Sequence, residues 1–168
     1  DLIPVVKGNG YGFGRTTLIE HAQKISSDIA VGTIFEAHDL PSSCRAFVLT
    51  PVGKALPPAK KKMTENMVLT IGSVGHVQNL RDAGWHGDVV IKLRSSMNRY
   101  GSDSSELSAL VTAVQAAGLK QIGWSVHPPL DGTPKSHATE IGNIISGVDS
   151  DLPWFVSHID AENLVDLR

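Results

Sequence analysis

The sequence predicts an α/β fold in which parallel strands are joined by crossover helices, and three observations support this class. Short apolar runs rich in β-branched residues recur along the whole chain. Segments with the apolar spacing of helices fall between these runs. No linker of low complexity interrupts the alternation, so residues 1–168 are expected to form a single domain.

Seven apolar runs are the expected strands, and six segments between or after them are the expected helices. The strands are expected at residues 2–7, 28–34, 46–51, 67–71, 88–93, 121–126 and 153–158. The helices are expected at residues 16–26, 36–40, 74–84, 104–118, 137–147 and 161–168. In the fourth helix, Leu107, Leu110 and Val114 share one apolar face, and Gly118 is a natural stop. The short basic run at residues 60–62 is expected to be a solvated helix start.

Charge and cysteine content narrow the classes of protein that this chain can represent. The 15 basic and 17 acidic residues give a net charge of −2, which offers no electrostatic support for binding nucleic acid or an anionic membrane. Cys44 is the single cysteine, so no intramolecular disulfide can form, and a reducing compartment fits. There is no signal peptide and no apolar stretch of about 18 residues. We therefore expect a cytoplasmic protein.

The first fourteen residues carry the strongest functional signal. Lys7 ends an apolar run and is followed by alternating glycines, the place where a strand of an α/β protein opens into a loop that binds ligands. A lysine there can stay solvated, pair with a phosphate or form a Schiff base with a carbonyl cofactor. The glycines let the backbone approach a ligand, and a helix starting near Thr16 would direct free N–H groups toward an anion.

Two other interpretations of this loop remain possible from the loop alone. The glycines could belong to a dinucleotide-binding turn, with Glu36 as the acid that binds a ribose, but the spacing G-x-G-x-G-x-G differs from G-x-G-x-x-G. The loop could also be a simple glycine-rich turn that carries a surface lysine.

The segment VVKGNGYGFG at residues 5–14 resembles the pyridoxal-phosphate lysine motif of the alanine racemase N-terminal domain, a strand followed by K-A-N-A-Y-G-H-G. Five positions of the motif match: Lys7, Asn9, Tyr11, Gly12 and Gly14. Three differ: Gly8, Gly10 and Phe13. Four further segments resemble family motifs in the family's order, at residues 30–40, 89–101, 122–129 and 155–161.

The resemblance implies a role for each of five residues. Lys7 would form the internal aldimine with pyridoxal phosphate and move the α-proton of the substrate. Arg99, in SSMNRYG, would reach the cofactor phenolate and the substrate carboxylate, and His127 would pack against the cofactor ring. Tyr11 and Ser157 would contact the cofactor phosphate, although the family's Asn-Ser-Ala is here Val-Ser-His.

Lys92 has the spacing to Arg99 at which some family members carry a carbamylated lysine. The usual Asp-Thr-Gly between the two residues is here Arg94, Ser95 and Ser96, which argues against that modification. No metal is expected, because the histidines form no H-x-x-x-H or H-x-H pair and one cysteine cannot build a zinc site. A G-x-S-x-G nucleophile elbow is absent, so a serine hydrolase is not expected either.

The resemblance also implies the overall architecture, a (β/α)8 TIM-type barrel that is incomplete as given. About seven strand–helix units are present, and the eighth strand is missing. We expect a fragment that lacks the family's C-terminal β-domain, since a naturally incomplete barrel would leave two sheet edges unpaired.

The function that follows is that of a pyridoxal-phosphate-dependent racemase that interconverts L- and D-alanine, a homodimer at full length. A non-catalytic pyridoxal-phosphate-binding protein and a barrel aldolase are the alternatives. The family's second base is a tyrosine of the partner's β-domain, whereas the two tyrosines here, Tyr11 and Tyr100, lie in barrel motifs. The fragment alone is therefore expected to be inactive.

Overall fold

The computed structural model describes residues 1–53, 65–165 and 167, and it shows six parallel strands in one sheet. The expected helix start at residues 60–62 lies outside the described residues. The strands follow one another in sequence order across the sheet. They are β1 (Asp28–Val31), β2 (Arg45–Val48), β3 (Met67–Ile71), β4 (Asp88–Lys92), β5 (Lys120–Val126) and β6 (Trp154–Val156).

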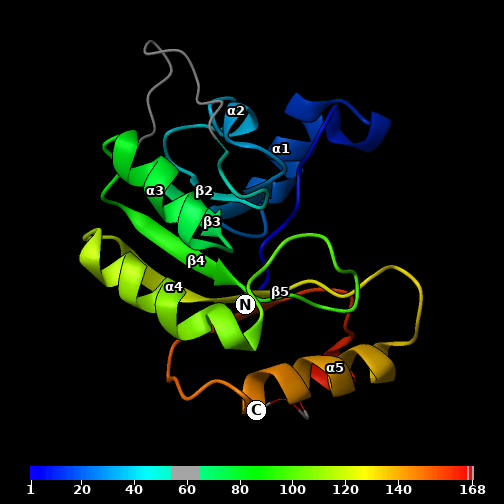
Figure 1. Cartoon of the computed structure of the whole chain (residues 1–168). Coiled ribbons are helices and arrows are strands. Elements are labelled where there is room, and N and C mark those ends of the chain that lie inside the picture. The colour runs from blue at the N-terminus through cyan, green and yellow to red at the C-terminus, as the bar shows by residue number, and fades with distance from the viewer. Residues whose placement is uncertain (54–64, 166, 168) are drawn as a thin grey trace.

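Helices connect most of the strands and cover the outer face of the sheet, with α3, α4 and α5 side by side along it (Figure 1). The α-helices are α1 (Arg15–Gln23), α2 (Ile34–Ala37), α3 (Val74–Asp82), α4 (Ser104–Ala116), α5 (Pro134–Ser146) and α6 (Ala161–Val165). A 3-10 turn, η1 (Gly10–Gly12), lies in the glycine loop. The result is an α/β half-barrel, so six strands replace the seven expected from the sequence.

The first expected strand, residues 2–7, is reduced to a single bridge between Val5 and Ala30. The Val6 N–H donates to the carbonyl of Ala30 (2.8 Å), and the Ala30 N–H donates to the carbonyl of Pro4 (2.8 Å). This segment lies at the edge of the sheet with one neighbour, and Pro4 has no N–H to give to a ladder. The segment nevertheless runs parallel to β1 and delivers Lys7 to the same end of the sheet.

Two helices begin earlier than the apolar spacing predicts, because polar residues cap them. The helix expected at 137–147 begins at Pro134, where the Thr133 hydroxyl accepts a hydrogen bond from the Ser136 N–H (3.1 Å) and proline occupies the first turn. The helix expected at 36–40 begins at Ile34, with Thr33 and Glu36 forming a capping box. Glu36 therefore lies inside a helix and not at the end of a strand.

Apolar side chains fill both faces of the sheet. The larger cluster lies between the sheet and the helices and includes the fully buried Leu69, Leu80, Ile91, Leu110 and Ile141. A smaller cluster lines the inner face and consists of Ala30, Phe47, Val68 and Val90. Burial of each large side chain stabilises the fold by about 1.5–3 kcal/mol, so the outer layer supplies most of the apolar stabilisation.

Contacts between strands that are not neighbours show that the sheet curls. Phe47 of β2 and Phe155 of β6 place their ring centroids 5.1 Å apart although three strands separate them. At the amino ends of the strands, Asp88 pairs with Arg45 and also lies 3.6 Å from the Lys120 ammonium. These charged side chains lie at the amino ends of the strands, opposite the carboxyl end at which ligands of α/β proteins bind.

A close approach of two glycines fixes the loop that follows β4. A Cβ atom on Gly72, at the end of β3, would lie 2.9 Å from Gly101 Cα. A Cβ atom on Gly101 would lie 2.5 Å from the backbone carbon of Leu93, and Gly101 has φ +133°. Neither position has room for a side chain, so this contact holds the loop that carries Arg99 against β3.

Gly101→Ala is therefore expected to lower the free energy of unfolding by about 3 kcal/mol, since backbone strain and overpacking each cost roughly 1–3 kcal/mol. Urea denaturation of the two proteins measures the difference. Gly75→Ala is the matched control: its Cβ would find Ser73 Oγ at 3.7 Å, within helix α3, and should be neutral or stabilising. Equal stability of the Gly101→Ala and Gly75→Ala variants would contradict the close approach.

Candidate functional site

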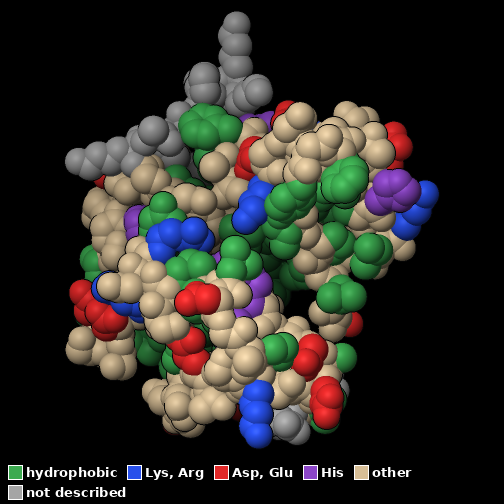
Figure 2. Space-filling view, turned by 90° about the vertical axis from the view of Figure 1, so that its right-hand side faces the viewer, with side chains coloured by type: hydrophobic (Ala, Val, Ile, Leu, Met, Phe, Trp, Pro, Cys, Tyr) green, Lys and Arg blue, Asp and Glu red, His purple; other side chains and the backbone are tan. Residues whose placement is uncertain are grey.

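The loops that follow the strands gather at one end of the half-barrel, on the right-hand side of Figure 1. Figure 2 looks onto this end and shows a hollow with basic and histidine side chains beside it. Because ligands of α/β proteins bind at the carboxyl ends of parallel strands, this end is the candidate site.

Lys7 lies at the start of the glycine loop, beside the end of β1. Its side chain is exposed, and a Cβ atom on Gly32 would lie 3.3 Å from Lys7 Cβ and 2.6 Å from a carboxylate oxygen of Glu36. A side chain at position 32 would therefore push both residues aside. Gly32 thus allows the lysine and the helix α2 carboxylate to share the end of one strand.

Glu36 and Arg15 hold the peptide groups next to Lys7. One Glu36 oxygen accepts a hydrogen bond from the Gly8 N–H (2.6 Å), and the other accepts one from the Thr33 N–H (2.6 Å). Arg15 donates to the Gly8 carbonyl (3.3 Å) and to the backbone carbonyl of Glu36. Both Glu36 oxygens therefore hold backbone N–H groups, one in the glycine loop and one at the start of α2, which gives this carboxylate a structural role.

Tyr11 lies further along the glycine loop in a left-handed backbone conformation, with φ +54°. Its side chain is 56% exposed, and its hydroxyl has no hydrogen-bond partner within the described part of the chain. Partial burial and the negative charge of Glu36 raise the pKa of Tyr11 above its ordinary value. The phenol therefore stays protonated and can donate a hydrogen bond to an anion.

Lys92 and His127 bring the other half of the site together. Lys92, on the inner face of β4, is 8% exposed, and burial together with the charge of Arg99 lowers its pKa to about 8. His127 follows β5; burial lowers its pKa to about 4, helped by the charges of Lys92, His158, Arg99 and Lys7. The charges of Lys92, Arg99 and Lys7 therefore lie close enough to act on His127, and its lowered pKa keeps the ring neutral at pH 7.

The site concentrates positive charge without a matching carboxylate. Among the described residues, no ion pair involves Lys7, Lys92 or Arg99. A buried cation is costly unless an anion compensates it, and a charged ligand can supply that anion. The arrangement therefore favours a ligand with several negative charges.

Ser157 adds a hydroxyl to this group. Its Oγ lies 2.5 Å from Nδ1 of His127, and the His127 ring packs against His158 with centroids 4.5 Å apart. The structure thus places Lys7, Arg99, His127 and Ser157 around one end of the half-barrel. Tyr11 lies at the Glu36 side of the same end.

The loop of Arg99 is held by the three residues that depart from the family's Asp-Thr-Gly. Arg94 pairs with Asp103 (3.1 Å), and Ser95 donates to the His127 carbonyl (2.6 Å). The Ser96 N–H and hydroxyl donate to the two carboxylate oxygens of Glu140 on α5. Arg99 itself is exposed and lies 5.5 Å above the ring of Tyr100.

Three non-glycine residues of the described chain have a positive φ, and each lies in a loop of this site. They are Tyr11, Asn98 and His158. Such backbones cost roughly 1–3 kcal/mol and cluster at functional sites. The strained positions neighbour the glycine loop, Arg99 and Ser157, which supports the same end as the site.

Some of these contacts were not predicted from the sequence. The structural role of Glu36 has one sequence signal, its T-x-x-E spacing from Thr33, which is typical of a capping box. Glu140 and His137 lie on the face of α5 toward the loops, and no sequence pattern identifies the loop that each contacts.

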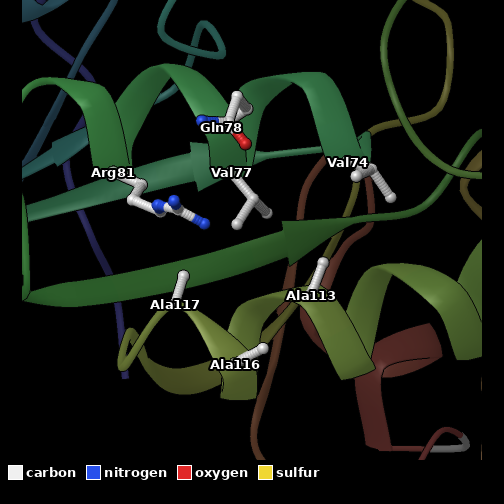
Figure 3. A pocket seen from close by; sticks show the side chains of 7 residues that line it. All are labelled: Val74, Val77, Gln78, Arg81, Ala113, Ala116 and Ala117. Atoms are coloured by element: carbon white, nitrogen blue, oxygen red, sulfur yellow. The ribbon is translucent and has the colours of Figure 1, made fainter.

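Elsewhere, a groove of about 160 Å³ runs between α3 and α4 on the outer face. Val77, Arg81 and Ala117 line it, and Figure 3 shows α3 and α4 facing each other across it. It lies away from the carboxyl ends of the strands. Within the described residues, no group of three or more His, Cys, Asp and Glu is placed to hold a metal, and no helix is long and apolar enough to cross a membrane.

Solved structures with a similar fold include several alanine racemases. The enzyme from Oenococcus oeni aligns with a TM-score of 0.70 at 17% identity. The alignment covers 91% of this chain and 48% of the chain of that enzyme. The enzyme from E. faecalis gives 0.68 at 21% identity, covering 92% and 46%. The Bartonella henselae enzyme, solved with covalently bound pyridoxal phosphate, gives 0.67 at 16% identity, covering 92% and 46%.

The chain thus spans about half the length of these solved relatives, and at such identities the likeness shows the fold. A comparison with curated protein sequences finds no significant match. The family described as "Alanine racemase, N-terminal domain" matches residues 1–145, which include Lys7, Arg99 and His127. The chain therefore belongs to the alanine racemase N-terminal domain family.

Proposed function

We propose that this chain is the cofactor-binding barrel of a pyridoxal-phosphate-dependent amino-acid racemase whose substrate is alanine and which acts as a homodimer at its natural length. The observation that carries the proposal is the grouping of Lys7, Lys92 and Arg99 around a neutral His127 without a paired carboxylate. Family membership and the alanine racemase neighbours support it.

The residues present fit a phosphorylated aromatic aldehyde. Lys7 supplies an exposed amine, and the positive charge of Arg99 and Lys92 compensates a phosphate, a phenolate and a carboxylate. The neutral ring of His127 can pack against an aromatic ring without adding charge. Tyr11 and Ser157 offer hydroxyls to phosphate oxygens. When bound, pyridoxal phosphate delocalises the negative charge that forms at Cα of an amino acid.

The chain's own residues would then have separate roles in binding and proton transfer. Lys7 Nζ would hold the cofactor covalently and take or return the α-proton, because its amine is the exposed one at the glycine loop. The Arg99 guanidinium would orient the substrate carboxylate through two parallel hydrogen bonds. Glu36 and Arg15 would keep Lys7 in place through the Gly8 peptide.

Exchange of the α-proton of L-alanine in deuterated water tests the proposal. The protein at its natural length, loaded with pyridoxal phosphate, should incorporate deuterium and release D-alanine. A non-catalytic carrier of the cofactor is the alternative outcome of this test. Cofactor binding without exchange, across a panel of amino acids, would favour the carrier and contradict racemisation.

Tyr11→Phe is expected to weaken cofactor affinity by roughly 0.5–3 kcal/mol, because it removes one hydrogen bond to a charged phosphate while keeping the ring. Fluorescence titration with pyridoxal phosphate measures the change. Tyr100→Phe is the control: it keeps the ring below Arg99 and should leave the affinity unchanged. Equal affinity of the Tyr11→Phe variant and the unmutated protein would show that Tyr11 does not bind the phosphate.

A further inference from the structure

Two histidines of the site tie the loop after β5 to the loop after β6. His137, on α5, places Nδ1 at 2.7 Å from the carbonyl oxygen of His158 and Nε2 at 3.0 Å from the carbonyl oxygen of Asp131. Carbonyl oxygens only accept hydrogen bonds, so both ring nitrogens must donate. A histidine that donates from both nitrogens is an imidazolium, so the geometry assigns a positive charge to His137.

The His158 side chain also connects these two loops, from the loop after β6 to the loop after β5. Its Nδ1 lies 2.8 Å from the carbonyl oxygen of Pro128 and 3.0 Å from that of Pro129, so this nitrogen also donates. Its backbone is left-handed, with φ +60°, and such a conformation persists only where the surroundings hold it. The carbonyl that His137 binds belongs to this strained residue.

The strained residue directly follows Ser157, whose hydroxyl bonds to His127. The His158 ring also packs against the His127 ring. A release of the His158 carbonyl would let this backbone relax toward the ordinary region and would turn Ser157 away from His127. The chain of contacts therefore runs from His137 through His158 to the hydroxyl proposed for the phosphate.

We propose that His137 is a positioning residue of the cofactor site, which as an imidazolium holds His158 in its left-handed conformation and so keeps Ser157 beside His127. This inference rests on the proposed function, since it assumes that Ser157 binds the cofactor phosphate. His137 does not touch the cofactor, and its effect passes through the backbone of His158.

The surroundings of His137 favour the charged ring. The carbonyls of His158 and Asp131 raise its pKa above the ordinary value, burial acts against them, and the carboxylates of Glu140 and Asp131 add to the increase. The His158 ring also lies close to His137, with 6.2 Å between the two ring centroids. Because the pKa of His137 is raised in the folded protein, both of its hydrogen bonds to carbonyls are fully formed at low pH. They weaken as the pH rises through the pKa of His137.

The first test uses the ligand-free protein. In proton–nitrogen spectra of the histidine rings, His137 should carry protons on both nitrogens at pH 6, while His127 should be neutral. On raising the pH, loss of the His137 proton should shift the His127 signals at the same midpoint. A His137 ring that is neutral at pH 6, or His127 signals that do not follow its titration, would overturn the proposal whether or not the protein binds pyridoxal phosphate.

The second test is a mutant cycle on cofactor affinity. His137→Gln should weaken pyridoxal-phosphate binding about tenfold at pH 6.5 and remove the part of the pH dependence that follows the His137 titration. In a protein that already carries Ser157→Ala, His137→Gln should lower the pyridoxal-phosphate affinity little further, because its effect passes through the Ser157 hydroxyl. His21→Gln, on exposed α1, is the control and should change nothing.

The outcomes separate the two proposals. If the unmutated protein binds no pyridoxal phosphate, the proposed function fails, and the ring spectra still decide the role of His137. If the unmutated protein binds the cofactor and His137→Gln binds it equally well, the positioning role fails alone. Full additivity of His137→Gln and Ser157→Ala would also contradict it, since the two residues would then act separately. Failure of His137→Gln to fold leaves the spectra of the unmutated protein as the test.

Discussion

Lys7→Ala is expected to abolish the borohydride-stable adduct that the unmutated protein forms with pyridoxal phosphate. Lys7 is the exposed amine on the glycine loop, Glu36 and Arg15 hold the neighbouring Gly8 peptide, and Gly32 leaves room for the lysine side chain. Without the Lys7 amine no imine with the aldehyde can form at this position, so borohydride has no imine there to reduce. Visible absorption before reduction, followed by peptide mass spectrometry after it, measures the adduct and its position.

Lys92 is the competing amine in this experiment, because it is the other lysine near His127. Its pKa is lowered to about 8, so a larger fraction of its amine is neutral at pH 7 than in an ordinary lysine. Its side chain is only 8% exposed, whereas Lys7 is exposed, so we expect the aldehyde to reach Lys7, and peptide mass spectrometry separates the two adducts. Lys24→Ala, at the exposed end of α1, is the control and should keep the adduct. An adduct on Lys92 in the unmutated protein, or none, would contradict the assignment of Lys7.

The positions of the strands could be predicted from the sequence because each strand is a short apolar run, and the central strands β3 and β4 are buried on both faces. Met67–Ile71 is buried at every position, and its apolar run gave the strand with its observed bounds. The segment at residues 2–7 looks the same in sequence but forms one bridge, since its pairing depends on a neighbour at the edge of the sheet and not on its own residues. The number of segments that form continuous strand pairs therefore could not be predicted from the residues of each segment alone.

The candidate site shows the same limit at the level of single contacts. The glycine loop and the positions of Arg99 and His127 could be predicted because each follows a strand, and parallel strands end at one edge. Contacts between loops could not, since the pairing of Ser96 with Glu140 joins residues 44 positions apart. The charge of His137 likewise depends on which carbonyls face its two nitrogens, which only the folded loops determine.

Arg99→Lys is expected to lower kcat/KM for alanine racemisation at least about tenfold in the protein at its natural length, a loss of about 1.4 kcal/mol in transition-state stabilisation. A guanidinium offers two parallel donors to a carboxylate, whereas an ammonium is a single point charge. Arg99 is exposed at the mouth of the site, on a loop held by Ser96 and Gly101, so the lysine can occupy the same place without disturbing the fold.

The split between turnover and cofactor affinity decides what Arg99 does. Cofactor binding should weaken much less than turnover, because the covalent bond at Lys7 and the phosphate contacts of Tyr11 and Ser157 do not involve Arg99. Arg81→Lys, in the groove between α3 and α4, is the matched control and should leave both quantities unchanged. An equal loss of affinity and turnover in Arg99→Lys would show that the guanidinium holds the cofactor alone, and unchanged turnover would remove it from the proposed substrate site.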